Sequence, residues 1–258
     1  MEYDALGVKG AGGARKTISK LKTTFQDLFI NTAYAAIAVD PNFTTYTHFA
    51  VATAESVTFA AHNVSGANRI MVIGAFDYSG QQIADVTVTF NADSATRIIS
   101  SQTNQANGLW RLINPDTGAN NVVISHAISS AIAGWEISFT GADQTQTTPG
   151  TGSANAASGT SVSTSVTTTA DNSFVIDVIS VDTADEVPGL VEGQGTQFVD
   201  FEPATNGNRM AGHYILKETA GAQTMSWSWA TSGSNGVRAM EILVGPDTGG
   251  KPRRIIID

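Results

Sequence analysis

The stretch that decides the fold is WRLINPDTGANNVVISHAISSAIAGWEISFTGAD, residues Trp110 to Asp143. It opens with side chains that alternate between two faces, and Pro115 and Gly118 then supply the chemistry of a tight turn. A β-branched run over 122–124 follows, and after a short break the residues around Trp135 alternate again. The stretch therefore predicts three antiparallel strands, with a turn between the first two.

Runs of the same kind lie on both sides of this stretch. Two of them, 69–76 (RIMVIGAF) and 173–181 (SFVIDVISV), are apolar at nearly every position, which is typical of strands buried on both faces. The run 83–90 alternates and predicts a strand buried on one face. Further predicted strands cover 46–61, 95–100, 162–168, 210–217, 223–230 and 236–244. With about ten to twelve short strands between turn residues, the chain predicts an all-β fold, an antiparallel β-sandwich that is jelly-roll-like.

The predicted body covers residues 46–244 and lies between an N-terminal arm, 1–45, and a C-terminal arm, 245–258. Apolar residues between 14 and 30 recur at helical spacing. They predict one short amphipathic helix, with an extended arm as the alternative.

Two polar segments interrupt the predicted strands. Residues 144–161 are rich in Gly, Ser, Thr and Asn and predict a long surface loop. Residues 182–208 predict a long acidic loop that contains one short apolar piece, 198–201. Strands of the same style resume after 161, so the first loop need not mark a domain boundary.

The composition narrows the classes of protein. Hydrophobic residues make up 41% of the 258 residues, enough for a sizeable core, and charged residues make up only 14%. With no cysteine, the chain can form neither a disulfide framework nor a thiolate site. The first residues lack a secretory signal pattern, and no apolar run approaches the roughly 20 residues that span a bilayer. We therefore expect a protein made in a cytoplasm, without a membrane partner.

The net charge of −9 is unevenly distributed. Eight of the 14 basic residues lie in the two arms, whereas residues 23–250 contain six basic and 20 acidic residues. An acidic body argues against a nucleic-acid partner, because such binding depends on neutralising phosphates. Solvated termini would account for the basic ends, and docking on acidic neighbours is the alternative. The docking residues would be Arg15, Lys16, Lys20, Lys22, Lys251, Arg253, Arg254, Ile255 and Ile256.

The sequence contains no motif for catalysis or for a cofactor. Its four histidines lack metal-ligand spacing, its glycine-rich segments lack nucleotide-binding patterns, and no GxSxG occurs. Acidic residues gather near the start of the second loop, where a solvated loop is the default interpretation and a calcium site the alternative. The calcium ligands would be Asp182, Asp185 and Glu186. We expect no catalytic residue and no cofactor.

Exposed aromatic side chains would offer another kind of site, a platform on which sugars stack. Trp135 lies in register with apolar residues, and Trp227 and Trp229 share one face of an alternating strand. We expect core packing for these three. Trp110 and Tyr214 are the aromatic candidates for ligand binding.

Taken in order, six segments carry a resemblance. They are NRIMVIGAF (68–76), VTVTF (86–90), LWRLINPDTGANNVVIS (109–125), IAGWEISFTGADQTQTTPGTG (132–152), VTTTADNSFVIDVISVD (166–182) and QTMSWSWATSGSNGVRAMEILV (223–244). This order resembles a β-sandwich domain found in phage structural proteins and in large bacterial surface proteins. The shared features are turns, core strands and a core tryptophan. The resemblance covers the predicted body and leaves both arms outside.

The resemblance implies a role without carrying any catalytic residue across. It implies a non-enzymatic virion structural protein, first a capsid decoration (cement) or surface protein and next a tail or fibre component. The partners would be other copies of the chain and other virion structural proteins, and the location would be the virion, after synthesis in the host cytoplasm. The alternative is a carbohydrate-binding adhesion module, whose partners would be glycans. A hydrolase is the third class, and no carboxylate pair stands out for it.

Overall fold

The structure is a computed structural model that describes residues 36–43, 47–77, 83–102, 105–146, 148–183, 191–201 and 208–245. In these residues every regular element is a β-strand except one short 3₁₀ turn, η1 (Ile83–Asp85). No helix of the described part is long and apolar enough to cross a membrane. All strand pairs are antiparallel, so the predicted all-β sandwich fold is confirmed. The helix predicted over 14–30 lies outside the described residues.

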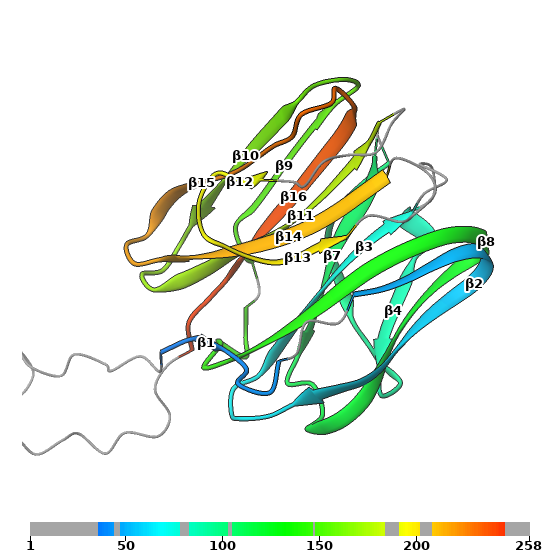
Figure 1. Cartoon of the computed structure of the whole chain (residues 1–258). Helices are drawn as coiled ribbons and strands as arrows, with labels where there is room; N and C mark the ends of the chain where they lie inside the picture. Colours follow the sequence, from blue (N-terminus) through cyan, green and yellow to red (C-terminus); the bar gives the residue numbers. More distant parts are fainter. Residues whose placement is uncertain are drawn as a thin grey trace, which may run out of the picture. The chain divides into compact units, whose positions relative to one another are not determined.

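The first half of the chain forms a sandwich of two layers (Figure 1). Its strands are β1 (Ala38–Val39), β2 (Thr47–Val64), β3 (Ile70–Asp77), β4 (Thr87–Phe90), β5 (Asp93–Ser94), β6 (Thr96–Ser101), β7 (Ala106–Ile113) and β8 (Gly118–Thr140). Residues 118–125 of β8 pair with β4 and with residues 56–64 of β2, which form an outer layer. The rest of β8 pairs with β3 and β1, and β7 and β6 extend this inner layer.

Strand β8 differs from the prediction of two runs with a break between them. Its pairing with β2 shifts register once between Asn120 and Val122, stops at Ser125 and resumes at Ser130, where the register has shifted again. An irregularity of this kind bends a strand without ending it. The weak pattern between residues 125 and 130 is therefore the place where one continuous strand passes from the outer to the inner layer.

The second half of the chain forms another two-layered sandwich. Its strands are β9 (Thr151–Ala156), β10 (Ser161–Thr168), β11 (Ser173–Asp182), β12 (Val191–Glu192), β13 (Thr196–Phe201), β14 (Asn208–Lys217), β15 (Gly221–Ser228) and β16 (Ser234–Ile242). The outer layer has the order β10-β15-β12 and the inner layer the order β13-β14-β11-β16-β9.

Three of these strands lie in the two segments that the sequence predicted as long loops, 144–161 and 182–208. The loop predictions are wrong where these strands form. β9 falls in 144–161, and β12 and β13 fall in 182–208. The inward-facing positions of β9 are glycine and alanine and its outward positions are Thr, Ser and Asn. Because glycine and alanine are small, the segment lacks the alternation of large apolar and polar residues that predicts a strand. Its composition is therefore that of a loop, although it pairs as an edge strand.

The two sandwiches share one topology, which the sequence did not reveal. Each of the six strand pairings in the second sandwich recurs in the first. β11 corresponds to β3, β14 to β7, β13 to β6 and β12 to β4. β9 and β10 correspond to the two halves of β2, and β15 and β16 to the two halves of β8. The body is therefore an internal structural repeat.

Within each repeat, strands from the first half of the repeat pair with strands from its second half, as in a long antiparallel hairpin that folds over to form two layers. In the second sandwich the first strand pairs with the last, the second with the seventh, and the third with the sixth. These three pairs are nested one inside the next, which is the arrangement of strands in a jelly roll. β13 completes the sheet beside β14 instead of pairing with β12.

The two inner layers pack face to face, so that four β-layers are stacked. In β3, Ile70 and Val72 face the second sandwich, whereas Met71 and Ile73 face the interior of the first. Strand β11 alternates in the same way, with one side in the cluster between the sandwiches and the other against β15. This double burial explains why both strands are apolar at nearly every position.

Trp135 fills part of the space between the inner layers. A Cβ on Gly74, its cross-strand neighbour in β3, would lie 2.3 Å from Cε2 of the indole, and a Cβ on Gly212 in β14 would lie 3.0 Å from the same atom. The ring packs edge-on against Phe198, with 4.9 Å between the ring centroids. Glycine at these two positions therefore makes room for the tryptophan.

Candidate functional site

The nine residues predicted for docking in the arms lie outside the described residues. The places where the arms join the body are described. A Cβ on Gly141, which follows β8, would lie 2.5 Å from the carbonyl oxygen of Ala36, so the chain passes very close there. The amide of Gly245 donates to the carbonyl of Gly141 at 2.8 Å. Ala36 and Gly245 therefore both contact Gly141. Residues 36–43 pair and pack with the body, so the residues before Ala36 and those after Gly245 leave it at one place.

The two aromatic candidates for ligand binding lie in packed surroundings. Trp110 is 2% exposed and points into the core of the first sandwich. That burial leaves no face on which a sugar could stack, and Trp110 is instead a core residue. Tyr214 is half-buried and packs edge-on against Phe139 and Phe174, with ring centroids 6.0 and 5.4 Å away. The expectation of core packing for Trp135, Trp227 and Trp229 is confirmed.

The proposed calcium ligands are only partly described. Asp182 ends β11 and is exposed, and Asp185 and Glu186 lie outside the described residues. Partial burial raises the pKa of Asp182, and a hydrogen bond with Gln105 opposes that rise. In the described part of the chain no group of three His, Asp or Glu side chains converges to hold a metal.

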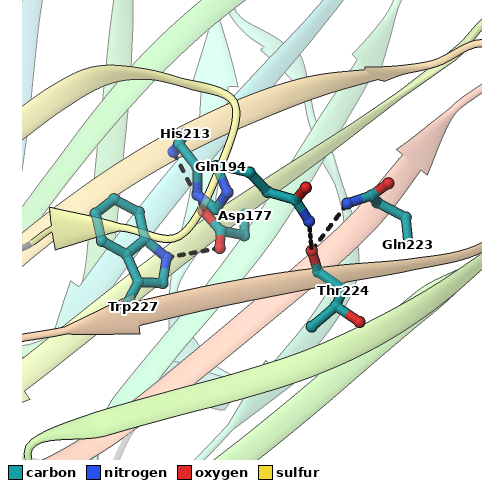
Figure 2. Close-up of polar contacts among 6 residues, drawn as sticks. All are labelled: Asp177, Gln194, His213, Gln223, Thr224 and Trp227. Carbon is teal, nitrogen blue, oxygen red and sulfur yellow. Dashed lines mark hydrogen bonds and ion pairs between the residues drawn. The ribbon is translucent and has the colours of Figure 1, made fainter.

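The second sandwich contains a buried polar network around Asp177 (Figure 2). The Oδ1 atom of Asp177 lies 2.8 Å from Nδ1 of His213 and also accepts from the His213 amide at 3.2 Å. Its Oδ2 atom accepts from Nε1 of Trp227 at 2.7 Å. These three residues come from β11, β14 and β15, so the network links both layers of the sandwich. In the sequence, Asp177 is the single charged residue of the apolar run 173–181.

This network has part of a catalytic arrangement and lacks the rest. A carboxylate that holds Nδ1 orients the imidazole, and Nε2 of His213 has no hydrogen-bond partner among the described residues. However, Asp177 and His213 are both 0% exposed. A Cβ on Gly195 would lie 3.1 Å from the His213 ring, so the β12–β13 connection closes over the histidine. A buried base without room for a reactant is a structural element.

The connection that covers His213 is itself tied to β15, as Figure 2 shows. The side chain of Gln194 donates to the carbonyl of Thr224 at 3.0 Å, and the side chain of Gln223 donates to the same oxygen at 2.9 Å. The bond from Gln194 holds the connection against the outer layer, whereas the bond from Gln223 lies within β15.

The first sandwich brings a serine, a histidine and a carboxylate close together. Oγ of Ser138 lies 3.1 Å from Nε2 of His62, and Nδ1 of His62 lies 3.5 Å from Oε1 of Glu136. Glu136 and Ser138 are two residues apart on β8 and therefore share one face of the strand. The serine and the histidine are within hydrogen-bond reach, but Nδ1 of His62 makes no hydrogen bond with Glu136 or with any other described residue, so the carboxylate does not orient the base as a triad requires.

Three features argue against nucleophilic catalysis by Ser138. Ser138, His62 and Glu136 are each at most 1% exposed, so a substrate cannot reach the hydroxyl. The hydroxyl also donates to the Asp40 carboxylate at 3.4 Å. A second carboxylate at that place would repel the negative charge that develops during acyl transfer. We assign this network to holding the segment around Asp40 against β8.

A shallow depression lies on the outer layer of the first sandwich. It has a volume of about 370 Å³ and is lined by Asn91, Ala92, Ala119, Asn120, Asn121 and Val123. Amide and alkyl groups can bind by hydrogen bonds and contact, but they provide no acid, base or nucleophile.

Comparison of the chain with protein-family models, with curated proteins and with solved structures finds no match in any of the three. What the structure establishes about kinship is therefore limited to the architecture. The chain is an all-β protein whose antiparallel sheets form two stacked sandwiches.

Proposed function

We propose that the chain is a non-enzymatic structural protein of a virion, first a capsid decoration or surface protein and next a tail or fibre component. In this proposal the two basic arms attach the body to its neighbours. The observation that supports the proposal is the different use of charged and polar residues in the arms and in the body. The buried polar groups of the described body serve its own packing, and eight of the 14 basic residues of the sequence lie in the arms.

The arginines of the body contact other groups of the same body. Each arginine of the described residues donates to, or pairs with, groups of the same body; they are Arg69, Arg97, Arg111, Arg209 and Arg238. Arg238 is 0% exposed, and burial lowers its pKa to about 10. Such arginines support the fold and offer little to an acidic partner. The arms contain eight of the 14 basic residues and supply most of the cations for docking.

The resemblance described above supports the same role, because its motifs are structural and lie in virion and surface proteins. The carbohydrate-binding alternative needs exposed aromatic rings. Trp110, Trp227 and Trp229 are at most 6% exposed, which counts against a stacking platform built from them.

The proposal is tested by limited trypsin digestion with mass readout, on the free protein and on the native assembly. We expect rapid loss of both arms from a resistant core in the free protein and protection of the arms in the assembly. Deletion of 1–30 or of 246–258 should abolish incorporation and leave the body folded. A matched control keeps the chain length and replaces Lys251, Arg253 and Arg254 by glutamine. Normal incorporation of both truncated chains would exclude docking by the arms.

A further inference from the structure

The outer layer of the first sandwich contains an open strand edge. Strand β4 pairs with residues 122–125 of β8, whereas β2 pairs with β8 right to its first residue. Just past β4, the amide of Asn91 donates to the carbonyl of Asn121 at 3.2 Å. Asn91 and Ala92 then have left-handed φ values, 48° and 71°, and turn the chain back into β5. In the part of the chain that the structure describes, residues 118–120 of β8 therefore have no strand on the β4 side.

The backbone groups of Ala119 lie on this edge. Successive residues of an antiparallel strand direct their N–H and C=O groups to opposite sides, so residues two apart direct them to the same side. Because the Asn121 carbonyl faces β4, the N–H and C=O of Ala119 face the same way, where β4 has already ended. Among the described residues, no hydrogen bond reaches the Ala119 carbonyl from this side. The edge therefore offers one amide and one carbonyl to an outside partner.

The second sandwich has the same edge at the corresponding place. Its strand β12, the counterpart of β4, pairs with only the last two residues of β15. The amide of the residue after β12, Gly193, donates to the carbonyl of Ser226 at 2.8 Å, and the equivalent bond in the first sandwich is the one from Asn91. Thr224, two residues before Ser226, is therefore the counterpart of Ala119.

In the second sandwich the chain's own side chains satisfy this edge. The Thr224 carbonyl accepts from the side chains of Gln194 and Gln223, at 3.0 and 2.9 Å (Figure 2). Counted from the same strand pairs, the counterparts of these glutamines in the first sandwich are Ala92 and Gly118, and neither has a side chain that can donate. A Cβ on Gly118 would meet no atom within 4 Å, so the space beside it is open. The first sandwich therefore lacks both of the donors that the second supplies.

The depression on the first sandwich lies at this edge. Its volume is about 370 Å³, and its lining includes Ala92, Ala119 and three asparagines, with no charged side chain. It therefore lies at the counterpart of the place that Gln194 covers in the second sandwich. Carboxamides and backbone groups both donate and accept hydrogen bonds, so this lining suits the main chain of an uncharged, extended peptide.

We propose that residues 118–121 of β8 are a docking site for an extended, uncharged peptide segment of a partner protein, which adds a short strand beside β8. A main-chain N–H or a carboxamide of the segment donates to the Ala119 carbonyl, and a carbonyl of the segment accepts from the Ala119 amide. Open strand edges are templates for such pairing, in which main-chain hydrogen bonds supply the affinity. The site lies on the body, so this inference goes beyond the proposed function and does not depend on the arms.

The probe for the first test is a synthetic peptide with blocked ends and the sequence of residues 193–197, GQGTQ, because this segment covers the corresponding edge of the second sandwich. It is titrated to millimolar concentrations into the isotope-labelled full chain, and the backbone amide signals are followed by NMR. We expect saturable shifts at 118–121 and at 91–92. A peptide with the change Q194E, whose side chain cannot donate, should bind about fivefold more weakly. The absence of saturable shifts at 118–121 overturns the proposal.

The second test blocks the site in the full chain in two different ways. Ala119→Pro removes the edge amide, a change that an open strand edge tolerates. Ala92→Gln supplies a carboxamide from within, as Gln194 does in the second sandwich. Each variant should lose the saturable shifts and keep the cooperative thermal unfolding of the wild type. Shifts that persist unchanged in both variants overturn the proposal, and Ala92→Gln decides alone if the proline variant does not fold.

The matched control is Ala222→Pro, which makes the same change at the start of β15. Ala222 follows a glycine with positive φ, as Ala119 does. This variant should bind the peptide like the wild type, and an equal loss of binding would contradict a site at β8. Deletion of 1–30 or of 246–258 should also leave the peptide shifts unchanged. Failure of the peptide to bind therefore leaves the proposed role of the arms standing.

Discussion

Three histidines whose side chains are described lie in the interior, each opposite a carboxylate. In each pair both residues are at most 4% exposed. The nearest nitrogen–oxygen distances are 3.5 Å for His62 and Glu136, 3.9 Å for His126 and Asp77, and 2.8 Å for His213 and Asp177. Burial of a polar group costs free energy unless the group has a hydrogen-bond partner. Removal of one partner therefore lowers the free energy of unfolding strongly.

We expect Asp177→Ala to lower the free energy of unfolding by about 3–5 kcal/mol, because it leaves His213 and Trp227 buried without their acceptor. Chemical denaturation measures the change. The control is Asp200→Ala, which breaks an exposed pair with Arg209 and should cost at most about 1 kcal/mol. Equal costs for the two substitutions would contradict a structural role for the Asp177 network.

The second prediction at the residue scale concerns the glycine under Trp135. A Cβ at position 74 would overlap the indole, so Gly74→Ala should cost about 1–3 kcal/mol through displaced packing between the sandwiches. Gly159→Ala is the matched control, because its nearest neighbour would lie 3.5 Å away. We expect that control to change stability by less than about 0.5 kcal/mol. Denaturation of both variants by urea checks the difference.

At the scale of elements, β1 is held to the body by more than its pairing. It pairs with β8 over only two residues. Just beyond it, the carboxylate of Asp40 accepts from the amide and the hydroxyl of Ser65, each at 2.6 Å, and from the amide of Asn42 at 3.0 Å. This set of bonds fixes the segment from which the N-terminal arm continues.

These contacts predict that the free energy of unfolding depends on pH. Burial by itself raises the pKa of Asp40, but the hydrogen bonds from Ser65, Asn42 and Ser138 outweigh it and lower the pKa below 3.8. A lowered pKa stabilises the fold at pH values above 3.8, and the contribution disappears as pH falls through the folded-state value. We expect Asp40→Asn to cost about 1–3 kcal/mol at neutral pH.

The difference between the wild type and Asp40→Asn should shrink as pH falls below about 3.8, because the unfolded chain takes up the proton there and the folded protein does so only at lower pH. Denaturation at several pH values measures this difference, and hydrogen exchange of residues 37–43 reports release of the segment. Ser65→Ala removes one donor and should show part of the same effect. A difference that is constant over this pH range would exclude the mechanism.

At the scale of the whole molecule, the two sandwiches depend on each other through the apolar layer between them. One cluster joins β3, β7 and β8 of the first sandwich to β11, β14 and β16 of the second. Neither inner layer is covered on both faces within its own sandwich. We therefore describe the body as one folding unit built from two repeats.

We expect an isolated second sandwich, residues 148–245, to associate or to unfold. Its inner layer would expose Phe174, Ile176 and Val178, and a patch of that kind drives aggregation. Size-exclusion chromatography and circular dichroism would show this, with residues 36–245 as the control that keeps both sandwiches. A monomeric fragment that unfolds in one cooperative transition would show that the second sandwich does not depend on the first.

Local pattern alone predicted much of the fold. The apolar runs at 69–76 and 173–181 became β3 and β11, buried on both faces, because burial on each side of a strand requires apolar residues at each position. The turn at Pro115–Gly118 was predicted from turn chemistry, and the left-handed conformation of Gly118, with φ of +91°, fits it.

The partners of buried polar residues depended on the tertiary structure. Nothing in the sequence near Ser138 points to His62, which is 76 residues away, because strand pairing between distant segments brings them together. The same holds for Asp177 and His213, joined by the register of β11 and β14. Spacing along the chain identifies sites on one helix or one loop, and these networks are built across sheets.

The sequence by itself determined most of the strand segments, with β9, β12 and β13 as exceptions, and showed that most basic residues lie in two arms. These properties follow from the period of side chains along each strand and from composition. The tertiary structure alone decided that the body is a repeated sandwich, that Trp110 lies in its core, and that both arms join it beside Gly141. Such features arise from non-local pairing, whose register no short stretch of sequence contains.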